Sequence, residues 1–178
     1  MKEESVSVKQ GKKALFYLIV QYQTDKIEAE RTIQMGNGNR GNTMIIKNGL
    51  VFTPEGKFEK KDFYIEGEYV AKETTDNKEV EAEGCYVIPG LVDIHFHGCV
   101  RHDMCDGTEE SIQALADYEA ANGVLAICPA TMTIPEEELF QAMNAAREHK
   151  NGKGADLVGI NMEGPFVNKE KKGAQKEE

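Results

Sequence analysis

The second half of the chain alternates between strand and helix patterns, and this alternation limits its possible folds more than any other feature. Strand patterns cover residues 91–96, 124–128 and 157–160, and helix patterns cover 108–123 and 133–150. The order βαβαβ predicts parallel strands joined by right-handed crossovers. Three parallel strands cannot close a barrel, and they leave long unpaired edges. The sequence therefore predicts an α/β fold that holds the first three strands of an incomplete (β/α)8 barrel.

Residues 44–88 have a different pattern, which predicts a small β domain. The apolar run after Met44 is followed by Asn48-Gly49 and a second apolar run, and this arrangement predicts a hairpin. Further strand patterns lie on both sides of Gly67 and over residues 85–88. Three or four hairpin strands predict a small sheet that forms part of a β-sandwich.

Residues 1–43 are predicted to be an N-terminal extension. Residues 36–42 hold only Gly, Asn and Arg, a composition typical of a flexible linker. Two interpretations stay open: a disordered extension, or a protein whose true start is Met44. The predicted organisation is thus an extension (1–43), a partial sandwich (44–88) and the first part of a metal-dependent barrel (89–178).

The composition excludes several classes of function. The chain has 178 residues, with 21 Lys and Arg against 31 Asp and Glu, and a formal net charge of −10. Affinity for nucleic acid or an anionic membrane depends on Lys and Arg, so neither partner is expected. The longest apolar run, residues 14–20, is too short for a bilayer, which needs about 20 residues. The 4 cysteines form no C-x-x-C pair, which indicates reduced thiols in the cytoplasm.

The chemistry of the chain is concentrated in the segment 93–98. Because strand side chains alternate between faces, one face is expected to be apolar and to pack under helices, with Val92, Ile94 and Phe96. The other face carries Asp93, His95 and His97. Two imidazoles on one face at the end of a strand suit a divalent metal, since neutral imidazole is a good ligand for Zn²⁺ or Fe²⁺. The alternative for such a cluster is a hydrogen-bonded polar patch.

A carboxylate is expected to join these two imidazoles. Glu163 follows the third strand pattern, so it is predicted to lie on the same rim as His97. There it could be a third ligand or a bridge between two metal ions. The alternative is an ordinary loop glutamate before a Gly-Pro turn.

At these residues the sequence resembles a known family. The segment Pro89–Gly98 resembles the metal-binding opening of the amidohydrolase superfamily. Three more blocks are similar to the N-acetylglucosamine-6-phosphate deacetylase family within it: Asp103–Gly107, Pro129–Thr133, and Glu163–Phe166 together with Lys172–Gln175. The resemblance covers about residues 44–178.

This resemblance implies a sandwich plus a (β/α)8 barrel, a homodimer, and a cytoplasmic role in amino-sugar catabolism. The implied reaction is hydrolysis of N-acetylglucosamine 6-phosphate to acetate and glucosamine 6-phosphate. Glu163 matches the family's principal metal ligand. His95 and His97 match a pair that holds a second divalent ion, Zn or Fe, in some members. Ala174 and Gln175 match the pair that touches the substrate.

The chain also departs from the family pattern. Asn161 stands where His is common, and residues 100–102 stand where a Gly-containing turn is usual. The family's later metal-binding histidines and its catalytic Asp are expected beyond residue 178. We therefore expect this chain to be truncated and inactive by itself. The alternatives are another amidohydrolase, such as a dihydroorotase-like or deaminase member, or a gene fragment with no catalytic function.

Overall fold

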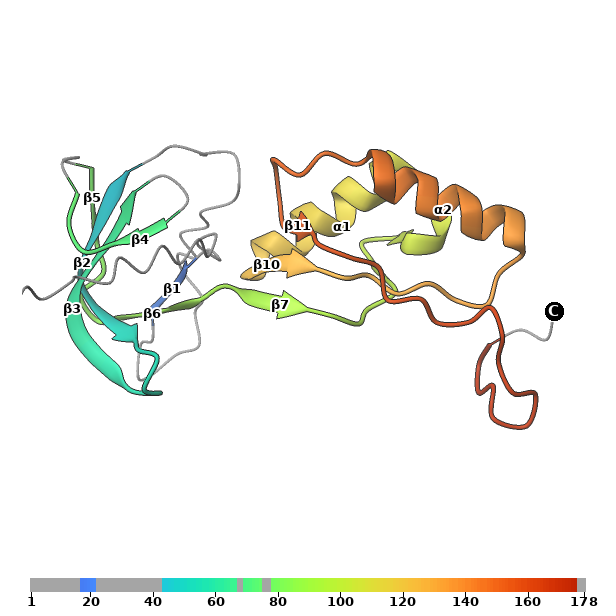
Figure 1. The fold of residues 1–178 in the computed structure, drawn as a ribbon, viewed down its shortest axis with the longest axis horizontal. Coiled ribbons are helices and arrows are strands. Elements are labelled where there is room, and N and C mark those ends of the chain that lie inside the picture. The colour runs from blue at the N-terminus through green and yellow to red at the C-terminus, as the bar shows by residue number, and fades with distance from the viewer. Residues whose placement is uncertain (1–16, 22–42, 67–68, 75–77, 176–178) are drawn as a thin grey trace, which may run out of the picture.

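The computed structural model describes residues 17–21, 43–66, 69–74 and 78–175. Figure 1 shows two parts joined end to end: a twisted β-sheet, and a small parallel sheet covered by two helices. Within the predicted extension, the described residues are the strand β1 (Tyr17–Gln21) and residue 43. The predicted linker 36–42 lies outside the described residues. None of the described helices is long and apolar enough to cross a membrane.

The first part is a six-stranded sheet with the order β1-β6-β2-β3-β4, in which β5 also pairs with β2. Its other strands are β2 (Met44–Phe52), β3 (Phe58–Glu66), β4 (Tyr69–Ala71), β5 (Glu79–Glu81) and β6 (Cys85–Pro89). Apolar side chains from β2, β3, β6 and the short segment after β5 form the core of this part. They are Met44, Ile46, Val51, Phe63, Ile65, Ala82 and Val87.

The hairpin predicted at Asn48-Gly49 is wrong. These residues lie inside the continuous strand β2, where the register with β3 shifts between Ile46 and Gly49. Asn48 has φ of 62°, and it is held there by side chains from distant strands. Its backbone N–H donates to Asp62 Oδ1, and its side-chain amide donates to Glu81. The left-handed residue therefore forms a bulge, and the chain reverses after β2, at residues 53–57.

The second part contains the predicted parallel sheet, with the order β11-β10-β7. Its strands are β7 (Leu91–Asp93), β10 (Val124–Ile127) and β11 (Asp156–Leu157). Helix α1 (Glu109–Ala121) connects β7 to β10, and α2 (Glu136–Glu148) connects β10 to β11. The alternation of strand and helix is thus confirmed.

The helix boundaries follow local chemistry. The Thr108 hydroxyl accepts a hydrogen bond from Ser111 N and so caps α1, as predicted. The chain leaves α1 at Asn122 and Gly123, and Gly123 has φ of 88°. Apolar side chains of α1 and Ala142 of α2 pack on the sheet, and the buried members of this second core are Met104, Ile112, Leu115, Ala116, Ala120, Ile127, Ala142 and Ala155.

A short hairpin and a helical turn lie between β7 and α1. Strands β8 (Gly98–Cys99) and β9 (His102–Asp103) pair, and the 3-10 turn η2 (Met104–Asp106) follows. The two residues between the strands, Val100 and Arg101, have φ of 47° and 69°. Glycine or asparagine is usual in such a turn, because L side chains are strained there. The departure seen in the sequence at residues 100–102 therefore places a β-branched side chain in a left-handed conformation.

The faces of β7 differ in part from the expectation. Phe96 packs against the second core, as predicted. Val92 and Ile94 are exposed, so their predicted burial under the helices is wrong. Helix α1 contacts β10, and no described element covers Val92 and Ile94.

Candidate metal centre

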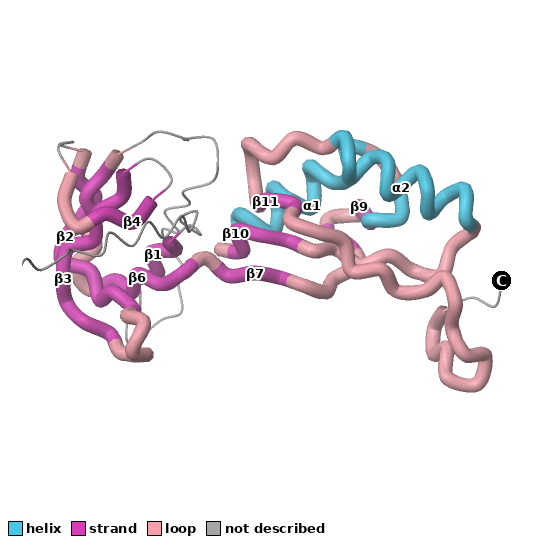
Figure 2. The backbone as a smooth tube through the Cα atoms, in the orientation of Figure 1, coloured by secondary structure: helices cyan, strands magenta, loops and turns pink. Residues whose placement is uncertain are grey.

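The site lies where three segments leave the parallel sheet side by side (Figure 2). Backbone hydrogen bonds join these segments beyond the strands themselves. Cys128 N donates to the Asp93 carbonyl at 2.8 Å, and Ala130 N donates to the Phe96 carbonyl at 2.6 Å. Asn161 N donates in turn to the Pro129 carbonyl at 3.0 Å. This pairing places the segment with both imidazoles and the segment with Glu163 on either side of residues 128–131.

The structure brings the three predicted ligands together. His95 Nε2 lies 3.5 Å from Glu163 Oε2, and His97 Nε2 lies 3.4 Å from the same oxygen. The two imidazole rings meet edge to face, with centroids 5.3 Å apart. A metal ion usually needs at least three His, Cys, Asp or Glu ligands close together. Among the described residues, His95, His97 and Glu163 form such a group, with ligand atoms that all lie within 4.8 Å of one another.

These distances suit a tetrahedral metal ion. Ligand bonds of about 2.0–2.1 Å place two ligand atoms of a tetrahedron about 3.3–3.4 Å apart. The two Nε2–Oε2 separations are close to that value, and they exceed the range of about 2.7–3.2 Å for a good N–H···O hydrogen bond. Nδ1 of His97 is buried and has no hydrogen-bond partner. Two imidazole nitrogens and one carboxylate oxygen form a donor set that fits Zn²⁺ or Fe²⁺.

Two neighbours, Thr131 and Gln175, fix the position of Glu163. Its backbone N–H donates to Thr131 Oγ1 at 3.2 Å, and the Thr131 hydroxyl lies 3.3 Å from the Glu163 carbonyl. The side-chain amide of Gln175 donates to Glu163 Oε1 at 2.7 Å. Oε1 is thus bound to the protein, and Oε2 faces both imidazoles.

Asn161 contacts His95 from the other side. Its Nδ2 donates to the Ile94 carbonyl at 2.9 Å and lies 3.0 Å from His95 Nδ1. The His95 backbone N–H donates to Asp93 Oδ1 at 2.9 Å. The sequence singled out Asn161 only as a departure from the family, and these contacts show that it links the ends of β7 and β11.

The two predicted substrate-binding residues, Ala174 and Gln175, differ in their exposure to solvent. Ala174 is exposed, whereas Gln175 is buried with 6% of its surface accessible. The Gln175 carbonyl oxygen Oε1 accepts a hydrogen bond from Thr133 N at 2.7 Å. Thr131 and Thr133 lie in the block Pro129–Thr133, and the sequence predicts a role for neither, because their contacts with Glu163 and Gln175 span more than 30 residues.

The other polar residues near the histidine pair have structural partners. Asp103 caps the turn η2, and His102 Nδ1 lies 3.1 Å from Ser111 Oγ. Burial raises the pKa of the Cys99 thiol and raises that of Cys105 to about 11. Both thiols therefore stay protonated at neutral pH in this structure.

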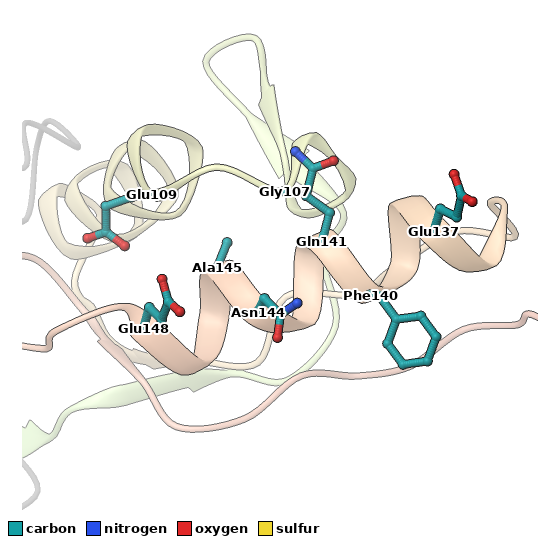
Figure 3. Close-up of a pocket in the computed structure, with 8 residues that line it drawn as sticks. All are labelled: Gly107, Glu109, Glu137, Phe140, Gln141, Asn144, Ala145 and Glu148. Atoms are coloured by element: carbon teal, nitrogen blue, oxygen red, sulfur yellow. The ribbon is translucent and has the colours of Figure 1, made fainter.

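A separate pocket of about 490 Å³ lies on the helical layer and not at the imidazoles (Figure 3). Its lining comes from the start of α1 and one face of α2, and includes Glu109, Glu137, Phe140 and Glu148. Glu109 Oε1 lies 2.9 Å from Nδ1 of a buried histidine, His149. The pocket is open and lined by carboxylates.

Comparisons with known proteins show similarity to deacetylases. The chain is 31% identical over 140 residues to N-acetylglucosamine-6-phosphate deacetylase of Bacillus subtilis, which covers 75% of this chain and 34% of that protein. It is 28% identical over 135 residues to N-acetylgalactosamine-6-phosphate deacetylase of Escherichia coli O157:H7, covering 74% of this chain and 36% of that protein. Both relatives are deacetylases by name, and the similarity confirms the resemblance predicted from the motifs.

The structure is also similar to a solved deacetylase. A crystal structure of N-acetylglucosamine-6-phosphate deacetylase from Pasteurella multocida matches with a TM-score of 0.67 at 19% identity, over 76% of this chain and 38% of that one. This match supports the α/β fold. No protein-family model matches the chain. The chain spans about a third of the length of the curated relatives it matches.

Proposed function

We propose that this chain is the metal-holding part of a hydrolase that removes the acetyl group of N-acetylglucosamine 6-phosphate. The products are acetate and glucosamine 6-phosphate. The observation that carries the proposal is the meeting of His95, His97 and Glu163, from two strand ends 66 residues or more apart, around one carboxylate oxygen. Similarity to deacetylases over three quarters of the chain supports the choice of reaction.

The proposed architecture is a (β/α)8 barrel of which β7, β10 and β11 are the first strands, after part of a β-sandwich. The parallel order of these strands and the fold match to a deacetylase support it. Catalytic residues of such barrels lie at the carboxyl ends of the strands, and the three proposed ligands follow the carboxyl ends of β7 and β11. For the complete protein we propose a homodimer in the cytoplasm, and the free state of all 4 cysteines is consistent with a reducing compartment.

His95, His97 and Glu163 are proposed to hold one or two divalent ions, Zn or Fe. Such an ion supplies an activated water molecule at neutral pH and polarises a carbonyl group. Glu163 is oriented for this role by Thr131 and Gln175. The exposed Ala174 is the member of the predicted substrate pair that is open to a ligand.

Proton transfer needs a further group. A carboxylate must take the proton from the attacking water and return it to the leaving amine. The family resemblance places this Asp, with two more histidines, on later strands. The 178-residue chain is therefore proposed to bind metal without turning over substrate.

Two measurements test the proposal. Metal analysis and calorimetric titration of the purified chain are expected to show Zn²⁺ binding that is lost in Glu163→Ala and kept in Glu110→Ala, which changes an exposed carboxylate of α1. In the second test, residues 44–178 replace the matching third of the Bacillus subtilis enzyme, and acetate release is measured with N-acetylglucosamine 6-phosphate and its galactosamine epimer. We expect activity that disappears with Glu163→Ala. A chain without metal affinity, or deacetylation by the chain alone, would contradict the corresponding part of the proposal.

A further inference from the structure

The side chain of Gln175 is buried and hydrogen-bonded to the protein, whereas a side chain that binds a ligand must be accessible to it. Its side chain is enclosed, with 6% of the residue accessible, and both ends of its amide have protein partners. Oε1 accepts from Thr133 N at 2.7 Å, and Nε2 donates to Glu163 Oε1 at 2.7 Å. Nε2 also lies 3.6 Å from the Met132 sulfur. These contacts leave the amide directed into the protein.

The Thr133 contact determines which way the amide faces. A backbone N–H can only donate, so the atom opposite Thr133 N must be the amide oxygen. The nitrogen then faces Glu163, where it donates to the carboxylate. A rotation of the amide by 180° would place two donors against each other at Thr133 and two acceptors against each other at Glu163. The planar amide is therefore locked in the orientation that binds Glu163.

The backbone of Gln175 is fixed as well. Gln175 N donates to the Lys172 carbonyl at 3.1 Å, and Lys172 Nζ donates to the Gln175 carbonyl at 2.9 Å. This turn sets the point from which the side chain reaches Thr133 and Glu163. Gln175 thus connects the segment after β10, the segment after β11 and the last described residues of the chain.

From this arrangement we infer that Gln175 is a positioning residue of the metal centre, which holds Oε1 of Glu163 so that Oε2 is presented to the ion. The inference rests on the proposed metal site and goes beyond it, because it assigns Gln175 to the carboxylate and not to the substrate. A carboxylate held at one oxygen cannot rotate freely, so it loses less conformational entropy when an ion binds. Removing a residue that orients a ligand in this way typically weakens metal affinity 10–100-fold.

The test compares Gln175→Met with Gln141→Met in the full chain. Methionine has a similar length and no amide, and Gln141 is an exposed residue of α2 that lines the separate pocket. Zn²⁺ affinity is measured by competition with a chromophoric chelator, and the visible absorption of the Co²⁺-loaded chain reports the ligand geometry. We expect Gln175→Met to weaken Zn²⁺ binding about 10–100-fold and to alter the Co²⁺ spectrum. Gln141→Met is expected to change neither.

Gln175→Asn gives a second variant if Gln175→Met does not fold. It keeps the amide, but it is one methylene too short to reach both partners, so the same loss of affinity is expected. If a folded variant binds Zn²⁺ as tightly as the parent and has the same Co²⁺ spectrum, Gln175 does not position Glu163. A parent chain that binds no Zn²⁺ overturns the metal site itself, and the inference with it.

Discussion

Replacing Gly164 by alanine tests how closely the backbone beside Glu163 must approach the segment after β10. Gly164 has φ of 83° and directly follows Glu163. A Cβ atom built there would lie 2.9 Å from Thr133 Oγ1 and 3.3 Å from Thr133 Cα. Thr133 N holds the amide of Gln175, so a shift of Thr133 passes to the carboxylate.

The expected cost has two components. A left-handed conformation costs an L residue roughly 1–2 kcal/mol, of which roughly 0.4–1 kcal/mol is offset because alanine restricts the unfolded chain. Crowding against Thr133 adds roughly 1–3 kcal/mol. Gly173→Ala is the matched control, because Gly173 has φ of 60° and a Cβ there would meet nothing within 4 Å. It carries the first component and lacks the second.

The assay is urea unfolding followed by far-ultraviolet circular dichroism, since the chain has no Trp and both described α-helices lie in the second part. We expect Gly164→Ala to lower the free energy of unfolding by about 1–3 kcal/mol more than Gly173→Ala. Zn²⁺ affinity is expected to fall in Gly164→Ala and to stay near the parent value in Gly173→Ala. Equal effects of the two variants on both quantities would refute the reasoning.

Three other changes have expected outcomes. His97→Ala should weaken Zn²⁺ binding in a titration by more than the roughly 10–100-fold typical of a residue that only orients a ligand, whereas His102→Ala should leave it unchanged. Leu115→Ala should lower the free energy of unfolding by about 2–5 kcal/mol, because Leu115 is fully buried, and the exposed Phe140→Ala should change it by no more than about 0.5 kcal/mol in the same urea assay. Because burial raises the Cys105 pKa from 9.0 to about 11, the folded state keeps a proton that the unfolded state loses, so stability should fall as pH rises from about 9 to 11. Alkylation of Cys105, followed by mass spectrometry, should increase over the same range.

Local pattern was enough to predict the second part of the fold. The alternation of strands and helices and the Thr108 cap depend on residues close together in the chain, and the parallel pairing follows from the order of these elements. The meeting of Glu163 with the two imidazoles also followed, because parallel strands place their carboxyl ends at one edge. That a metal ion binds there stays a prediction.

Contacts between distant residues decided what local pattern could not. Asn48-Gly49 resembles a hairpin turn locally, but Asp62 and Glu81 hold Asn48 within a strand. The surroundings of Gln175 could not be predicted for the same reason, since its partner Thr133 lies 42 residues away.

The link between the two parts of the chain has a consequence for the metal centre. Strand β6 ends at Pro89 and β7 begins at Leu91, so a single buried residue, Gly90, separates two strands that belong to different sheets. The junction consists of this one residue, and His95 lies five residues after it. A twist or tilt of the six-stranded sheet would therefore change the direction in which the backbone enters the site, and it would carry the imidazole rings with it.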